Sequence, residues 1–446
     1  MNYLVAIVGG AVSGAEAAHQ LTERGVECVV FDQNMLPYGK IEDGLPKWHS
    51  KLRDKEEKRI DEKLGHELVH FVPGVRLGRD LQFEDLIHDW GFSAVLLAIG
   101  AWRDRPLPVE GVDAYIGKGL IYQNPFIHWF NHKHEHAADP ATYEIKDGAI
   151  VVGGGLASLD VVKVLMIETV MQALKARGHE FNMFDLDRSI AKVLDELGLT
   201  LDDLGLKGCT LFYRRRIVDM PLSPMPVTSP ESRAKVEAVR EKILNNYAGK
   251  YLFNVKPQHV PTDKIVENGR LAGLIFRQTK IEGGSAVPVP GTETEVRAPY
   301  VISSIGSIPE AIPGIPHRGS MYDIIEEPCC RVAGYANVFA IGNTVTGRGN
   351  IKESLNHGRE ISKRIIESYM DNTAELSMEA SLVTQRSEVK RSVDGLMPKV
   401  SHVDANSREE ILSRVKDLWK LSGYKGNYSD WVAKHTPKRL EDIVGH

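Results

Sequence analysis

The sequence contains few cysteines, with only 4 among 446 residues, at positions 28, 209, 329 and 330. They form neither a C-x-x-C pair nor the four-thiolate spacing that an iron–sulfur cluster or a structural zinc site requires. The adjacent Cys329 and Cys330 leave a vicinal disulfide or redox pair as an alternative, although redox-active disulfides ordinarily use separated cysteines. A disulfide scaffold is excluded.

Long apolar runs are also absent, since no uncharged apolar stretch approaches the ~20 residues needed to cross a bilayer. The N-terminal run Tyr3–Val8 leads directly into a glycine turn, without the basic region and cleavage site of a signal peptide. We therefore expect this run to be a buried strand, and we expect the protein to be cytoplasmic, with no membrane span.

Positive charge is not in excess, because the net charge is -5. This balance argues against a nucleic-acid-binding protein. The length and the hydrophobic content of 42% are those of a globular protein, with room for two domains and an appendage.

Short apolar runs recur along the chain, and several are followed by glycine and a helical pattern. They are Tyr3–Val8, Cys28–Phe31, Ala94–Ile99, Ala149–Val152, Cys209–Tyr213, Tyr300–Ile305 and Val338–Ile341. The pattern predicts an α/β fold with two Rossmann-like nucleotide-binding domains, each with its own parallel sheet. Loops at Pro106–Asp113 and Pro299–Pro309 suggest that the second domain is inserted in the first. We predict a first domain in two parts, 1–110 and 301–375, an inserted domain 111–300, and a C-terminal extension 376–446.

The C-terminal extension is polar up to about residue 406. Ser407-Arg408-Glu409-Glu410 then resembles a capping box, which predicts the start of an amphipathic helix. Its apolar residues Ile411, Val415, Leu418 and Trp419 lie on one face, so we expect the helix to pack on the core.

The first glycine turn, Gly9–Gly14, lies between a predicted strand and a predicted helix, where backbone N–H groups can bind a pyrophosphate. Its candidate cofactor-binding residues are Gly9, Ala11, Ser13 and Gly14, with Ala11 in place of the usual second glycine. Asp32 ends the next strand, at the spacing of a carboxylate that accepts ribose hydroxyls and repels a 2′-phosphate. These features favour the unphosphorylated adenosine ribose of FAD or NAD over that of NADP, and we expect FAD. The alternative is a tight turn with Asp32 as a solvated strand end.

The second glycine turn, Gly153–Ser158, repeats this arrangement with serine in place of the third glycine. Its candidate residues are Gly153, Gly155, Leu156, Ala157 and Ser158. The following strand ends in Arg214-Arg215-Arg216, where guanidinium groups suit a 2′-phosphate. Arg214 and Arg215 therefore favour NADPH over NADH, with a solvated strand end as the alternative.

Over nearly its whole length, the sequence resembles the adrenodoxin reductase-like ferredoxin–NADP reductases and the small subunit of glutamate synthase. The landmarks are both glycine turns, Pro37-Tyr38-Gly39-Lys40 with Asp43–Pro46, Leu97–Ala101, Pro125–Asn131, Tyr213-Arg214-Arg215, Tyr300–Gly306, Asn337–Asn343, Gly347–Ile351 and Ser429-Asp430-Trp431. Asn343 stands where the ferredoxin reductases tend to have tryptophan. Tyr213-Arg214-Arg215 looks closer to the glutamate synthase small subunits.

The resemblance implies further cofactor-binding residues: Gly39, Lys40, Leu45, Gly100, Gly342, Asn343, Gly349, Asn350 and Ile351. Gly342 and Gly349-Asn350-Ile351 would lie beside the flavin, where a helix start donates N–H groups. His49 stands where these reductases often have a histidine, although a lone loop histidine is more often structural.

The resemblance also implies hydride transfer between NADPH and FAD, followed by single-electron exchange with ferredoxin or another iron–sulfur protein. Such hydride transfer depends on placing the two rings close together, so we predict no acid–base catalytic residue. Two alternatives stay open: an electron-input subunit of a larger iron–sulfur complex, and a non-catalytic nucleotide-binding redox sensor. Any cluster must belong to a partner.

Two polar segments have simpler interpretations. His132, His134 and His136 alternate as metal ligands can, but their neighbours indicate a hydrated loop, so we predict no metal site. The charged run Lys51–Arg59 indicates a solvated helical face, with docking of an acidic ferredoxin as the alternative.

Overall fold

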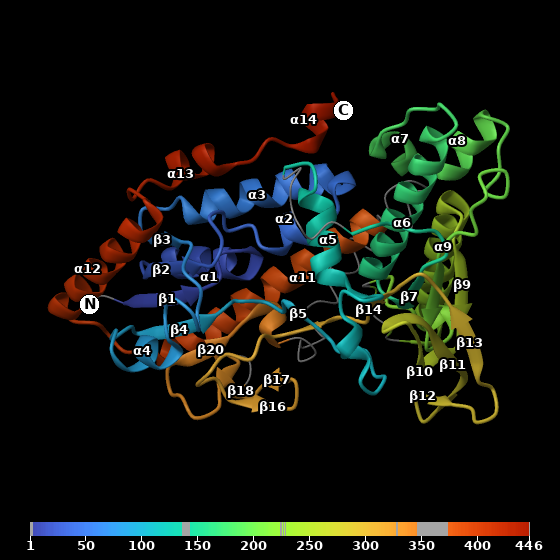
Figure 1. The fold of residues 1–446 in the computed structure, drawn as a ribbon. Helices are drawn as coiled ribbons and strands as arrows, with labels where there is room; N and C mark the ends of the chain where they lie inside the picture. The colour runs from blue at the N-terminus through green and yellow to red at the C-terminus, as the bar shows by residue number, and fades with distance from the viewer. Residues whose placement is uncertain are drawn as a thin grey trace.

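The computed structural model describes residues 3–135, 143–223, 225, 227, 229–326, 329–345 and 373–445. It contains two sheets with parallel strands and flanking helices, which lie side by side in Figure 1. The predicted α/β class is confirmed, and each of the seven apolar runs contains a strand.

The first sheet has seven strands in the order β18-β19-β20-β4-β1-β2-β3. Their bounds are β1 Leu4–Val8, β2 Glu27–Asp32, β3 Val69–Pro73, β4 Ala94–Leu97, β18 Ile324–Glu326, β19 Arg331–Val332 and β20 Val338–Ala340. Strands β3, β2, β1, β4 and β20 pair in parallel. Because β1 is central and both its faces are covered, all five of its side chains are buried.

Helices cover this sheet. They are α1 Val12–Thr22, α2 Lys40–Asp43, α3 Ser50–Leu64, α4 Phe83–His88 and α11 Thr373–Leu396, with the 3-10 helices η1 Lys47–His49, η4 Gly342–Val345 and η5 Met397–Lys399. Helix α1 packs between α3 and α11, so residues from the start and the end of the chain share one core.

The second sheet has five parallel strands in the order β6-β14-β7-β8-β9. They are β6 Leu120–Tyr122, β7 Ile150–Gly153, β8 Thr210–Tyr213, β9 Asn254–Pro257 and β14 Val301–Ser304. Its helices are α5 Gln123–His132, α6 Leu156–Lys175, α7 Met183–Arg188, α8 Ile190–Glu196 and α9 Pro230–Tyr251, with η2 Val112–Tyr115 and η3 Ile217–Asp219. Strand β14 lies just beyond the predicted limit at residue 300, yet it pairs inside this sheet. The division of the chain into these four segments stays a prediction.

An antiparallel four-stranded sheet, absent from the sequence analysis, follows β9. It consists of β10 His259–Glu267, β11 Arg270–Glu282, β12 Ser285–Pro288 and β13 Thr294–Arg297. Two short strands, β5 Arg103–Asp104 and β15 Ser307–Ile308, pair antiparallel where the chain passes between the two parallel sheets. A further hairpin joins β16 His317–Arg318 to β17 Met321–Tyr322.

The C-terminal extension contains α12 Ala405–Ser422, α13 Tyr428–His435 and α14 Leu440–Val444, which run along the first sheet and over α3 in Figure 1. The predicted capping box at Ser407 is wrong. Asp404 is the N-cap, and its carboxylate accepts the backbone N–H groups of Asn406 and Ser407, so the helix begins earlier. The expectation that the apolar face packs on the core is confirmed, since Ile411 and Val415 are buried. No helix in the described part of the chain is long and apolar enough to span a membrane.

The last residues of the chain are held by buried charges. Arg439 donates two hydrogen bonds to the Glu57 carboxylate, at 2.9 and 2.7 Å, and a third to Glu42. Arg53 pairs with Glu441 of α14. Because Arg439, Glu42 and Glu57 are all buried, this cluster fixes the C-terminal segment to α2 and α3.

Candidate functional site

A cavity of about 1240 Å³ lies between the two parallel sheets. Its walls include the residues that follow β1, β2, β7 and β8, all at the carboxyl ends of parallel strands. Ligands of open α/β sheets bind at such ends, so the topology alone marks this cavity as the candidate site.

The first glycine turn is shaped by two close backbone approaches. Gly9 has a positive φ of 99°, and a Cβ there would lie 2.6 Å from the Ala98 carbonyl oxygen. A Cβ at Gly14 would lie 1.8 Å from the Gly9 carbonyl oxygen, so only glycine lets α1 start this close to β1. Ala11 is the N-cap of α1, whose first backbone N–H groups open on the cavity beside Ala11 and Ser13.

Asp32 ties the end of β2 to this turn. Its carboxylate accepts the backbone N–H of Gly10 at 2.7 Å and that of Asn34 at 2.9 Å. Burial raises the pKa of Asp32 to about 6, although both backbone hydrogen bonds oppose the shift. The side chain lines the cavity and is only 5% exposed, so the alternative of a solvated strand end is wrong.

The second glycine turn is packed differently. A Cβ at Gly153 would lie 2.4 Å from the Ser304 carbonyl oxygen, which accepts a hydrogen bond from the Ser158 hydroxyl at 3.0 Å. The Tyr213 ring covers Gly154, where a Cβ would lie 2.2 Å from a ring carbon. Gly155 is the N-cap of α6, so this turn also presents a helix start to the cavity.

The three consecutive arginines after β8 have different surroundings. The Arg216 guanidinium pairs with the Asp219 carboxylate through two hydrogen bonds, at 3.0 and 2.9 Å. Arg215 donates to the Gly284 carbonyl oxygen at 2.7 Å and does not line the cavity. Arg214 is exposed and lines the cavity, and among the described residues its guanidinium has no hydrogen-bond or ion-pair partner.

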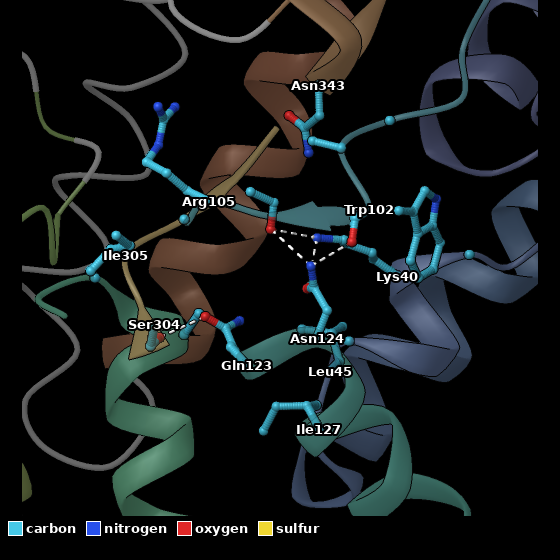
Figure 2. Close-up of a pocket in the computed structure, with 18 of the residues that line it drawn as sticks. Lys40, Leu45, Trp102, Arg105, Gln123, Asn124, Ile127, Ser304, Ile305 and Asn343 are labelled. Carbon is cyan, nitrogen blue, oxygen red and sulfur yellow. Dashed lines mark hydrogen bonds between the residues drawn. The ribbon is translucent and has the colours of Figure 1, made fainter. Parts of the chain in front are cut away.

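Lys40 joins the two halves of the cavity wall (Figure 2). Its ammonium donates to the Asn124 side-chain oxygen at 3.1 Å and to the Ser307 hydroxyl at 3.2 Å. Burial lowers the pKa of Lys40 to about 8, while the nearby Asp104 carboxylate opposes this shift. The backbone at Gly39 has a φ of 51° and approaches Ala11 closely, so the Gly39–Lys40 segment lies directly against the first turn.

His49 lies deep in the junction, where its Nε2 is 3.4 Å from the Asp160 carboxylate. Both side chains are buried, and Asp160 lines the cavity. The sequence did not assign Asp160 a role.

Most of the predicted site residues face the same cavity. Those that line it are Gly9, Ala11, Ser13, Asp32, Gly39, Lys40, Leu45, Gly100, Gly153, Gly155, Leu156, Ala157, Ser158, Arg214 and Asn343. Gly14, Arg215 and Gly342 do not, and Gly342 instead packs closely against Ser13. Gly349, Asn350 and Ile351 lie outside the described residues, so their place beside the flavin stays a prediction.

Several cavity residues were not predicted from the sequence. Asn124, Ser307, Trp102 and Arg105 line the junction around Lys40, and Gln385 of α11 reaches Ser13, whose hydroxyl accepts its hydrogen bond at 2.7 Å. Asn124 directly precedes the quoted segment Pro125–Asn131, which was the nearest signal. No sequence signal identified Gln385, because it lies in the polar extension.

Known proteins resemble this chain in sequence. Residues 3–195 match the family described as pyridine nucleotide-disulphide oxidoreductase. The glutamate synthase [NADPH] small chain of Halomonas elongata is 26% identical over 82% of this chain and 68% of its own length. The mitochondrial NADPH:adrenodoxin oxidoreductase of Arabidopsis thaliana is 27% identical over 37% of this chain and 33% of its own.

The fold also matches a solved structure. The structure of Mycobacterium tuberculosis FprA in complex with NADPH aligns over 94% of this chain and 91% of its own, with a TM-score of 0.66 at 17% identity. This chain spans between about a third and two thirds of the length of the two sequence relatives. Residues 3–195 thus resemble the pyridine nucleotide-disulphide oxidoreductases, and the predicted resemblance of the chain to glutamate synthase small chains and adrenodoxin reductases is confirmed.

Proposed function

We propose that this chain is an FAD-dependent NADPH oxidoreductase, which transfers hydride between NADP(H) and FAD and exchanges single electrons with ferredoxin or another iron–sulfur protein. One observation carries the proposal: two strand–glycine–helix turns, from two separate parallel sheets, open into one cavity. A shared cavity is what hydride transfer demands, because the reacting atoms must approach to within about 3–3.5 Å.

The residues of the first turn fit FAD. The start of α1 offers backbone N–H groups for a pyrophosphate, and Asp32 offers a carboxylate at the strand end. With a pKa of about 6, this carboxylate is mostly ionised at pH 7, so it accepts ribose hydroxyls and disfavours a 2′-phosphate. The methyl group of Ala11 narrows the approach to the turn without closing the cavity.

The residues of the second turn fit NADPH. The start of α6 faces the cavity, and Arg214 lies at the end of β8 with its guanidinium available for a phosphate. Arg215 and Arg216 already hold protein acceptors, so their role there is to shape the loop and to add positive charge.

Bound FAD would supply the hydride-accepting and one-electron chemistry, and the protein has to position the two cofactors and exclude water. Lys40, Asn124 and Ser307 connect the two domains at the centre of the cavity, so they fix the distance between the two turns. No side chain is assigned as an acid or a base.

The cysteines of this chain bear on the identity of the electron partner. Three of its four cysteines are buried and the fourth is half-buried, and they lack a cluster-binding spacing. These residues therefore bind no iron–sulfur cluster themselves, and we propose that the single-electron partner is ferredoxin or an iron–sulfur subunit. The relationship to a glutamate synthase small chain over 82% of this chain favours a second candidate, an electron-input subunit of a larger complex. A cytoplasmic location stays a prediction.

Anaerobic stopped-flow absorbance tests the proposal. The purified chain, reconstituted with FAD, is mixed with NADPH or with NADH while the oxidised flavin band is followed. Rapid bleaching with NADPH supports the assignment, and a chain that binds no flavin, or whose flavin NADPH leaves oxidised, refutes it. Fast reduction by NADPH with slow transfer to added ferredoxin, restored in a copurified complex, would identify the subunit alternative.

A further inference from the structure

A cluster of histidine and carboxylate side chains lies outside the cavity, where α2 meets α5. Asp43 is the last residue of α2, while His128 and His132 lie four residues apart on α5. The His132 Nε2 is 3.0 Å from the Asp43 Oδ1, and the His128 Nε2 is 3.8 Å from the same oxygen. The three candidate ligand atoms all lie within 4.8 Å of one another.

The spacing fits a small divalent ion. Histidines four residues apart lie on one face of a helix, the arrangement by which helices present two imidazoles to zinc. Zinc binds nitrogen and oxygen at about 2.0–2.2 Å, so ligand atoms in a tetrahedral site are about 3.3 Å apart. The two distances to Asp43 lie on either side of that value.

A second carboxylate orients one of these ligands. The Glu135 Oε2 accepts a hydrogen bond from the His132 Nδ1 at 3.0 Å, on the side of the ring away from Asp43. Metal-bound histidines almost always donate their other ring N–H to an acceptor such as a carboxylate, a backbone carbonyl or a water, which fixes the ring and raises its basicity as a ligand. His128 is more than half exposed and Asp43 is largely buried, so an ion can enter from solvent on one side.

The backbone around the cluster is also fixed. The buried Asn131 side chain donates to the carbonyl oxygens of Glu42 and Leu45, both at 2.9 Å, and thereby holds the end of α2 against α5. Figure 1 shows these two helices in contact at the junction between the parallel sheets. Asp43 and His132 are therefore presented by a rigid frame.

We propose that Asp43, His128 and His132 form a three-ligand site for a divalent transition metal ion such as Zn²⁺, with the fourth position open to water. The ion joins α2, which carries Lys40, to α5, which carries Asn124. It therefore links these two helices a second time, in addition to the hydrogen bond from Lys40 to Asn124. The set differs from the histidines that the sequence suggested: His134 is not one of the three, and His136 lies outside the described residues. Two imidazoles and one carboxylate select Zn²⁺ over Mg²⁺, which prefers oxygen ligands.

The test measures metal binding rather than electron transfer. The full-length protein is stripped with a chelator, incubated with Zn²⁺ or with Mg²⁺, desalted and analysed for bound metal, and zinc affinity is measured by competition with a chromophoric chelator. We expect one Zn²⁺ per chain in the wild type and at least a tenfold loss of affinity in His128→Ala and in Asp43→Asn. Zn²⁺ should also raise the thermal midpoint of the wild type, but not that of His128→Ala.

His88→Ala is the matched control, because His88 is an exposed helical histidine beside Glu84, at 3.2 Å, on α4. It should retain the wild-type stoichiometry and affinity. His128 is exposed, so its replacement does not threaten folding. Zinc binding that His128→Ala leaves unchanged, a wild type that retains no zinc, or equal retention of Mg²⁺ would each overturn the proposal. A wild type that retains no zinc would leave the pairs of His132 with Asp43 and Glu135 as structural ion pairs alone.

Discussion

The role of Arg214 can be tested against a control in the same segment, because Arg215 and Arg216 carry the same charge but have different partners. The Arg214 side chain lines the cavity, while Arg216 is paired with Asp219. If Arg214 binds the 2′-phosphate, Arg214→Ala removes hydrogen bonds between charged groups, which contribute about 1.5–3 kcal/mol. This corresponds to an increase of about 10- to 150-fold in the Kd for NADPH, with little change for NADH.

Arg216→Ala is the control. It removes the same formal charge from the same segment, but its guanidinium is already engaged, so we expect no more than about a threefold effect on NADPH from the weaker long-range field. The assay is the concentration dependence of anaerobic flavin reduction, measured with both nucleotides for both variants. Equal losses in the two variants, or equal losses with NADPH and NADH in Arg214→Ala, would refute the assignment of Arg214 to the 2′-phosphate.

Three further predictions concern stability, measured by urea unfolding. Arg439→Ala should cost about 3–5 kcal/mol, because it leaves the buried Glu57 carboxylate without its bidentate partner; a cost below 1 kcal/mol would show that the C-terminal segment is not held as described. Gly154→Ala should cost about 1–3 kcal/mol, since a Cβ collides with a tyrosine ring, whereas Gly155→Ala, whose Cβ finds its nearest neighbour at 3.9 Å, should be nearly neutral; similar costs would contradict the packing. The folded pKa of Lys40, about 8, lies below the unfolded value, so this residue's contribution is fully present above the unfolded pKa and is lost as pH falls through 8. The change in the free energy of unfolding caused by Lys40→Met, relative to wild type, should therefore be more favourable at pH 7 than at pH 10 by about 2 kcal/mol. A difference that does not depend on pH would falsify this reasoning.

The sequence predicted the parts of the site that are local in the chain. Gly9, Gly14 and Asp32 were identifiable because a buried strand, a close helix start and a second strand end follow one another within a few tens of residues. Their geometry follows from backbone contacts that only glycine permits, and glycine is visible in a sequence. Arg214 could be assigned to the second site in the same way, but the different surroundings of Arg215 and Arg216 depend on Asp219 and on the distant Gly284.

The residues that join the two domains could not be predicted in this way. Lys40 finds Asn124 and Ser307 at separations of 84 and 267 residues, and no local pattern relates them. The same holds for Arg439, whose partner Glu57 lies 382 residues away. The start of α12 was predicted wrongly for a local reason. Asp404 caps the helix, and it precedes the serine whose spacing to glutamate resembles a capping box.

The short ribbon of β5 and β15 has a consequence for the architecture as a whole. The chain leaves the first sheet through Arg103–Asp104 and returns through Ser307–Ile308, and the two passages are hydrogen-bonded neighbours. The intervening 105–306 segment therefore begins and ends at nearly one point, as a cassette does. A short turn in its place could reconnect the first sheet without changing its register, and a foreign nucleotide-binding unit with adjacent ends could be grafted at the same two positions.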